Sequence, residues 1–128
     1  MNDKELIEQC IRIYYEGLCE SDPLKIKKVF DKNAMIYGFY QGDEVFESNG
    51  EDYASNVDKV QPSPREMGER ELLEIISVEI QIPEFIANVE LRRAHLGEEQ
   101  WVKLLFLKKT SQSSWRIYTE IFHTEVIY

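Results

Sequence analysis

The chain has 128 residues, of which 43% are hydrophobic and 12% aromatic, so it carries enough apolar material for one packed core and too few residues for a second domain. We therefore expect residues 1–128 to form a single domain. The net charge of -9, from 24 acidic and 15 basic residues, works against nucleic acids and anionic membranes as partners, because clustered Lys and Arg residues bind phosphate groups.

Neither the N-terminus nor the cysteines suggest a secreted or membrane protein. No apolar run approaches the roughly 20 residues of a membrane-spanning helix, and the first five residues are acidic rather than signal-like. Cys10 and Cys19 would lie about 13 Å apart along one helix, which is too far for a disulfide. We expect a cytoplasmic protein with two buried thiols.

The first thirty residues predict two helices. Apolar residues recur at helical spacing from residue 3 to about residue 20, namely at Leu6, Ile7, Cys10, Ile11, Tyr14 and Leu18. Ser21-Asp22-Pro23 then supplies a cap and a proline suited to the first turn of a second, short helix. The two helices should meet at a sharp corner.

From Ala34 the apolar period changes to two, which indicates a strand. Met35, Tyr37 and Phe39 fall on one side of this strand, and Ile36, Gly38 and Tyr40 on the other. A turn at Gln41-Gly42-Asp43 leads into Val45-Phe46 and completes a hairpin. Asn49-Gly50 then begins a third helix, on which three residues share one face: Tyr53, Val57 and Val60.

The second half of the chain reads as successive strands over 76–82, 87–91, 102–106 and 117–121, separated by turns at 83–84, 97–98 and 111–113. Both sides of the strand at 104–107 are apolar, so something should cover its second face. This order of elements predicts an α+β fold, with the helices on one face of a curved antiparallel sheet and a cavity between the layers.

Several short motifs support a family resemblance: Tyr14-Tyr15-Glu16-Gly17-Leu18, Ser21-Asp22-Pro23, Val29-Phe30, Asn33-Ala34, Trp115-Arg116-Ile117 and Phe122-His123. Over nearly its whole length the chain resembles the nuclear transport factor 2-like superfamily, which includes SnoaL-like cyclases, ketosteroid isomerases and scytalone dehydratases. It is most similar to the branch called putative lumazine-binding proteins. The resemblance implies a cone-shaped fold with three N-terminal helices, and a homodimer formed through the outer face of the sheet.

The resemblance does not extend to the general base of the ketosteroid isomerases. Ketosteroid isomerases carry a general-base aspartate just after the first strand, and the matching segment 38–41 has no carboxylate. His123 shares strand parity with Trp115, Ile117, Thr119 and Ile121, so it should face the cavity and could transfer protons there. The alternative is a structural histidine. Glu120 and Arg116 have the opposite parity, and we expect them at a subunit interface, with a catalytic acid and cation as the alternative.

We expect the cavity to be lined by the rings of Tyr14, Tyr37, Phe39, Tyr53 and Trp101 together with His123. Plain core packing is the alternative for each ring. His95 should lie toward the same end of the sheet as His123 but about 10 Å away, and no metal-binding spacing is present. We therefore predict that the protein binds no metal and no cofactor.

Three functional hypotheses remain open at this point. The first is a small-molecule-binding protein whose cavity receives a planar aromatic or polyketide-like ligand. The second is a cofactor-independent cyclase, isomerase or dehydratase that uses His123 for proton transfer. The third is a structural dimerisation module with a filled core. Fold analogy alone does not choose among them.

Overall fold

We describe a computed structural model of the chain, in which residues 1–40, 44–81, 85–94 and 99–126 are described. The turns predicted at 41–43, 83–84 and 97–98, together with His95, lie outside these residues. The elements in chain order are α1 (Asp3–Glu20), α2 (Pro23–Val29), β1 (Phe30–Tyr40), β2 (Glu44–Asn49), α3 (Gly50–Asp58), β3 (Leu73–Gln81), β4 (Ile86–Ala94), β5 (Glu99–Ser111) and β6 (Ser114–Val126).

All three helices begin at side chains that cap their free backbone N–H groups. Asn2 accepts a hydrogen bond from the backbone of Glu5, whose carboxylate accepts one from the backbone of Asn2 in return. Asp22 caps α2 just before Pro23, and Asn49 caps α3. None of the helices in the described part of the chain is long and apolar enough to cross a membrane.

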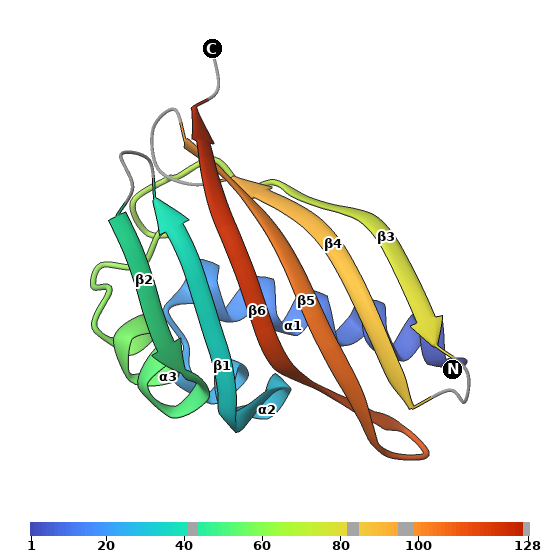
Figure 1. Cartoon of the computed structure of the whole chain (residues 1–128). Coiled ribbons are helices and arrows are strands. Elements are labelled where there is room, and N and C mark those ends of the chain that lie inside the picture. The colour runs from blue at the N-terminus through green and yellow to red at the C-terminus, as the bar shows by residue number, and fades with distance from the viewer. Residues whose placement is uncertain (41–43, 82–84, 95–98, 127–128) are drawn as a thin grey trace.

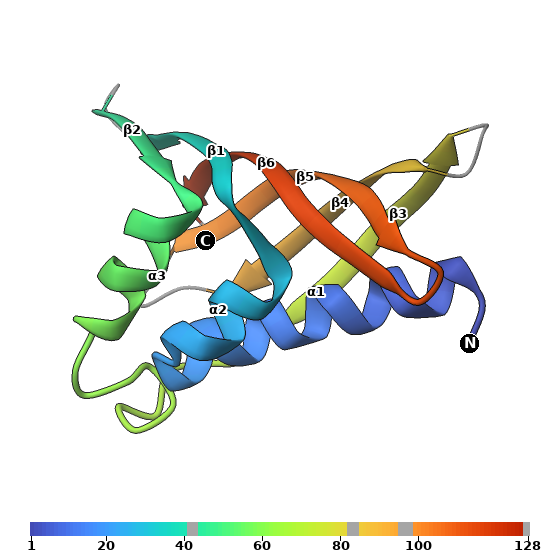
Figure 2. The same ribbon diagram turned by 90° about the horizontal axis from the view of Figure 1, so that it is seen from below.

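The strands form one curved sheet in the order β2-β1-β6-β5-β4-β3, and the three helices cover its concave face (Figures 1 and 2). Every neighbouring pair is antiparallel except β1 and β6, which run parallel. The predicted cone-shaped α+β fold with three N-terminal helices is thereby confirmed, with one parallel pair added to the expected antiparallel sheet.

The core lies between α1 and the concave face of the sheet. Ile7, Ile11 and Tyr14 form the buried stripe of α1. They face fully buried residues of four strands: Ile36, Val89, Leu91, Leu105, Leu107 and Ile117. Because α1 lies along the floor of the cone and α3 stands at the β2 end (Figure 2), the space near the C-terminal end of α1 is left for a pocket.

A β-bulge in β6 decides which residues of that strand face inward. Phe106 pairs with Thr119 while the next residue of β5, Leu107, pairs with Ile117, so Tyr118 is an extra residue in β6. Trp115 and Ile117 face inward before the bulge. After it the inward parity changes, and the buried residues are Glu120, Phe122 and Thr124.

This bulge makes two of the sequence-based expectations wrong. His123 was expected in the cavity and instead lies exposed on the outer, convex face, where its Nε2 is 3.2 Å from Oε1 of Glu125. Glu120 was expected at an outer interface and instead has no solvent exposure at all. Both expectations assumed that strand alternation continues unbroken from Trp115 to His123, and one extra residue reverses it.

The expected orientation of β1 is also reversed. Tyr37 and Phe39 were placed in the cavity, but they lie on the outer face, where Phe39 is 54% exposed. Ile36 and Gly38 are the buried positions that face the helices instead. Gly38 pairs with Phe122, and an added Cβ at position 38 would lie 2.0 Å from the ring, so glycine is what allows Phe122 to lie flat against the strand.

Candidate ligand pocket

A pocket of about 390 Å³ lies between the inner face of the sheet, α3, the end of α1 and the segment 59–72 that follows α3. Its lining residues are Leu18, Ser21, Tyr40, Phe46, Tyr53, Asn56, Val57, Val60, Pro64, Glu69, Arg93, Trp101 and Phe122. A concave, mostly apolar site of this size with a few polar groups is typical of a small-molecule site.

Four aromatic rings from four strands form the sheet side of the pocket. The centroids of Trp101 and Phe122 are 4.6 Å apart, and Tyr40 meets each of them at 5.5 Å. Phe46 completes the group at 6.1 Å from Tyr40. Edge-to-face packing holds these rings in fixed orientations, so the wall is preorganised for a flat ligand.

The helical side of the pocket comes from α3. Tyr53 and Val57 share one face of α3, as their spacing predicts, and both line the pocket. Val60, which was expected on the same helical face, lines the pocket from the segment that follows the end of α3 at Asp58. The Tyr53 ring packs edge-on against Phe30 at 5.4 Å, and its hydroxyl lies 3.2 Å from the hydroxyl of Tyr14. Tyr53 therefore connects the pocket to the buried interior.

Behind Tyr53 lies a buried polar cluster formed by Tyr14, Lys103 and Glu120. The Tyr14 hydroxyl donates to Oε1 of Glu120 at 2.6 Å, and Lys103 Nζ donates both to the Tyr14 hydroxyl and, at 3.4 Å, to Oε2 of Glu120. Lys103 and Glu120 side chains have no solvent exposure. Groups this deeply buried are tolerated because they satisfy one another.

Burial lowers the pKa of Lys103 to about 7, against the opposing effect of the Glu120 charge and with a smaller contribution from the Arg93 charge. The ammonium is further enclosed by the rings of Tyr14 and Trp101, both at 4.9 Å from Nζ. Burial also raises the pKa of Tyr14 well above its usual value, and the charge of Glu120 adds to this effect. Tyr14 therefore keeps its proton throughout the neutral range.

Arg93 supplies a cation at the pocket itself. It is the register partner of Trp101 across β4 and β5, so both side chains emerge on the same face, and its guanidinium carbon lies 4.5 Å from the Trp101 ring centroid. The pocket region therefore contains two basic side chains, with Arg93 in the wall and Lys103 behind the rings of Trp101 and Phe122.

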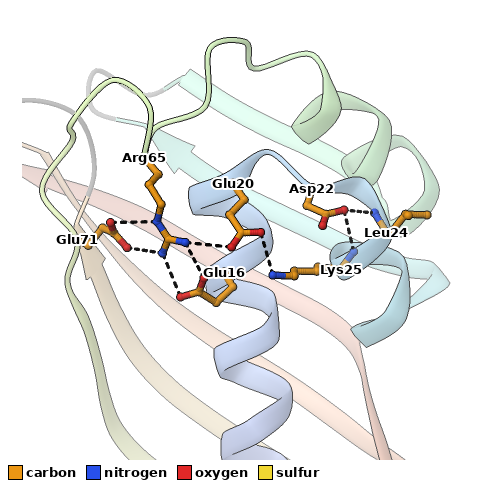
Figure 3. Close-up of polar contacts among 7 residues, drawn as sticks. All are labelled: Glu16, Glu20, Asp22, Leu24, Lys25, Arg65 and Glu71. Carbon is orange, nitrogen blue, oxygen red and sulfur yellow. Dashed lines mark hydrogen bonds and ion pairs between the residues drawn. The ribbon is translucent and has the colours of Figure 1, made fainter.

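The segment 59–72 forms the outer wall of the pocket through Pro64 and Glu69, and Arg65 fastens it to α1 (Figure 3). The Arg65 guanidinium donates to Glu71 at 2.6 Å, to Glu16 at 2.9 Å and to Glu20 at 3.0 Å. These contacts lower the pKa of Glu16 and Glu71. The backbone N–H of Arg65 also donates to the carbonyl of Cys19 at 3.0 Å, so both the side chain and the backbone of Arg65 hold the segment against α1.

The six residues predicted to line the cavity thus separate into three groups. Tyr53 and Trp101 line the pocket, and Tyr14 lies directly behind it. Tyr37, Phe39 and His123 lie together on the opposite face of the sheet. Across the described ranges, no three His, Cys, Asp or Glu side chains come close enough together to hold a metal ion.

Sequence reasoning missed Tyr40, Phe122, Arg93, Lys103 and Glu120. One of these left a readable signal: Lys103 has the parity of Trp101, Leu105 and Leu107, so a lysine stands on the core side of an otherwise apolar strand. A buried lysine requires an acidic or hydroxyl partner. The partner, Glu120, could not be identified because the bulge hides its orientation.

Comparison with known proteins identifies the fold. The sequence profile of the family described as "Putative lumazine-binding" matches residues 2–123. No curated protein sequence matches the chain. Among solved structures, an NTF-2 like protein of unknown function from Silicibacter pomeroyi has a TM-score of 0.79 at 17% identity, with 98% of this chain and 100% of that one covered.

Two further structures illustrate the range of similar proteins. An NTF2-like protein of unknown function from Shewanella baltica has a TM-score of 0.78 at 18% identity, covering 96% of this chain and 94% of that one. A ketosteroid isomerase-like protein from Erwinia carotovora atroseptica has a TM-score of 0.67 at 14% identity, covering 97% and 98%. At these identities the likeness extends to the fold alone.

Proposed function

Because the chain belongs to the putative lumazine-binding family, we propose that the pocket beside α3 binds a planar aromatic or polyketide-like small molecule. The observation that carries this proposal is the wall of interlocked rings from Tyr40, Phe46, Trp101 and Phe122, which faces open space of about 390 Å³. A flat ligand can stack on such a wall and bury its apolar surface at little cost in side-chain ordering.

The charges at the pocket favour this class of ligand over a phosphate ester. Arg93 lines the pocket and stacks on Trp101, but Glu69 lines it as well. A phosphate is bound best by several cations or a bidentate arginine without a competing carboxylate nearby. The net charge of -9 adds to the cost of bringing a dianion to this protein.

Binding is favoured over catalysis by the position of His123. The enzyme hypothesis relied on this residue for proton transfer, which requires a group within hydrogen-bond reach of the substrate. His123 is exposed on the far face of the sheet from the pocket. The alternative of a structural module with a filled core is disfavoured by the pocket volume.

We also propose that two copies of the chain associate through the convex face of the sheet. The described residues of this face include exposed apolar side chains on β1 and β6, with Met35 at 45%, Phe39 at 54% and Ile121 at 41% exposure, and more deeply placed Leu104 and Phe106 on β5. A contiguous apolar surface of this kind is typical of an interface, and a stable dimer would bury roughly 1,500 Å².

A thermal-shift screen tests the proposed ligand class. Pterins, flavins and polycyclic ketones should raise the melting temperature, whereas phosphorylated sugars and nucleotides should not. Val60→Trp, on an exposed residue at the pocket, should abolish the shift, and Val45→Trp, on an exposed residue of β2 away from the pocket, should leave it unchanged. Stabilisation by phosphate esters alone, or a shift that survives Val60→Trp, would contradict the proposal.

A further inference from the structure

The directions of the hydrogen bonds in the buried cluster can be assigned by counting protons. The Tyr14 hydroxyl has one proton and two lone pairs. Its 2.6 Å contact with Oε1 of Glu120 is a short bond of the kind that a hydroxyl makes to a carboxylate, so the proton of Tyr14 lies in this bond. Lys103 Nζ donates to one lone pair of the same oxygen.

The hydroxyl of Tyr53 must then be the donor in its 3.2 Å contact with Tyr14. Tyr14 has no second proton to give, and two oxygen atoms that face each other in a buried site without a shared proton would both be left unsatisfied. With this bond, Tyr14 donates once and accepts twice, which uses all of its hydrogen-bonding capacity.

These hydrogen bonds determine what Tyr53 can offer to a ligand in the pocket. Tyr53 is the member of the cluster that lines the pocket, and its only proton is directed inward to Tyr14. Tyr14 is its single hydrogen-bond partner among the described residues. What Tyr53 can offer to a molecule in the pocket is therefore its oxygen lone pairs.

We propose that Tyr53 meets the ligand as a hydrogen-bond acceptor, so that the pocket selects planar aromatic molecules that carry an O–H or N–H donor on the ring. This inference rests on the proposed function and narrows its ligand class. A ligand that offers only a carbonyl or ether oxygen would face the Tyr53 oxygen without a proton between them, and would lose affinity for that reason.

The directions of these hydrogen bonds stay the same near neutral pH, because each member of the cluster remains the donor or acceptor assigned above. Burial raises the pKa of Tyr53 and of Tyr14, so neither hydroxyl loses its proton. Lys103 can donate to Tyr14 both as an ammonium and as a neutral amine. The position of Glu120, set by the bulge at Tyr118, provides the acceptor on which the whole arrangement depends.

Two matched probes test the inference: 2-naphthol, which carries an O–H donor, and 2-methoxynaphthalene, which keeps the ring and the oxygen but lacks the proton. Calorimetric titration at pH 7 should give a dissociation constant about three- to tenfold lower for 2-naphthol, the effect of one hydrogen bond. The comparison needs only the unmodified protein, so it does not depend on the folding of a variant.

Tyr53→Phe should remove this preference, because the dissociation constant of 2-naphthol should rise to that of 2-methoxynaphthalene. Tyr37→Phe removes the same hydroxyl from the outer face and should change neither constant. Equal binding of both probes, or an undiminished preference in Tyr53→Phe, would overturn the inference while leaving the aromatic pocket in place. Failure of both probes to bind would overturn the pocket proposal and this inference with it.

Discussion

Lys103 Nζ lies 3.4 Å from Oε2 of Glu120, and neither side chain has any exposure to solvent. The pair joins β5 to β6 diagonally, since Lys103 is the register partner of Phe122 and Glu120 that of Leu105. Removing one partner of a buried ion pair destabilises a protein strongly, because the other charge is left buried without compensation. Replacing both partners changes the stability much less. The stability of the sheet beneath the pocket therefore depends on both residues together.

Lys103→Met should lower the free energy of unfolding by about 3–5 kcal/mol, and adding Glu120→Gln should restore most of the loss. Urea denaturation of the two single variants and the double variant measures this coupling. Lys108→Met, on the same strand but in an exposed pair with Asp31, should cost less than about 1 kcal/mol. Additive effects of the two single changes would show that Lys103 and Glu120 do not interact.

The lowered pKa of Lys103 also predicts how stability varies with pH. Between about pH 7 and the ordinary lysine pKa of about 10.4, the unfolded chain binds a proton at this position that the folded chain has released. The free energy of unfolding should therefore rise with pH in this window, by up to about 1.4 kcal/mol per pH unit from this group.

The variant Lys103→Met/Glu120→Gln isolates this effect. Urea denaturation at intervals from pH 6.5 to 9 should show a rising difference in stability between the native sequence and the double variant. Tyr14 and Tyr53, which lie near Lys103, keep their protons over this range because burial raises the pKa of both, so their effects cancel in the comparison. A flat difference would mean that Lys103 keeps its ordinary pKa, and a falling difference would mean that folding raises the pKa.

The sequence predicted the architecture well because helix caps and periodicity are local. Asn49-Gly50 marked the start of α3, and Ser21-Asp22-Pro23 marked that of α2, each at the residue where the structure begins the helix. The placement of Tyr53 and Trp101 at the pocket followed from the same local patterns.

The orientation of strands was predicted less well because it depends on distant contacts. On β1, both Tyr37 with Phe39 and Ile36 with Tyr40 form apolar stripes, so alternation cannot say which stripe faces the helices. On β6, the extra residue Tyr118 is visible only through pairing with β5. The error on β1 assigned Tyr37 and Phe39 to the cavity. The error on β6 assigned His123 to it and excluded Glu120 from the core.

The Arg65 contacts predict that the outer wall of the pocket depends on one side chain. Arg65→Ala should speed amide hydrogen exchange across residues 59–72. It should also lower the affinity for aromatic ligands several-fold, because Pro64 and Glu69 lose their fixed positions in the pocket wall. Arg12→Ala, on an exposed position of α1, should do neither. Unchanged exchange in Arg65→Ala would show that the backbone contact to Cys19 alone holds the segment.

The proposed dimer predicts that charge on the convex face separates the copies. Ile121→Glu, at an exposed apolar residue of β6 beside Tyr37 of β1, should convert the species seen in sedimentation from a dimer to a monomer. Ile76→Glu, on an equally exposed residue of β3 at the far edge of the sheet, should leave the dimer intact. A native chain that sediments as a monomer at micromolar concentration would contradict the proposal.

The central claim, that the ring-lined pocket binds a planar aromatic molecule, is tested most directly by the fluorescence of Trp101. Trp115 lies near Asp3 at the opposite end of α1, about 25 Å along the helix, so the two tryptophans report on different places. In Trp115→Phe, where Trp101 alone emits, titration with lumazine, riboflavin and a polycyclic ketone should give a saturable change for at least one of them. In Trp101→Phe the same ligand should change the emission only by its own absorbance. A Trp101 emission that responds to none of these molecules, or that saturates instead with a sugar phosphate, would contradict the claim.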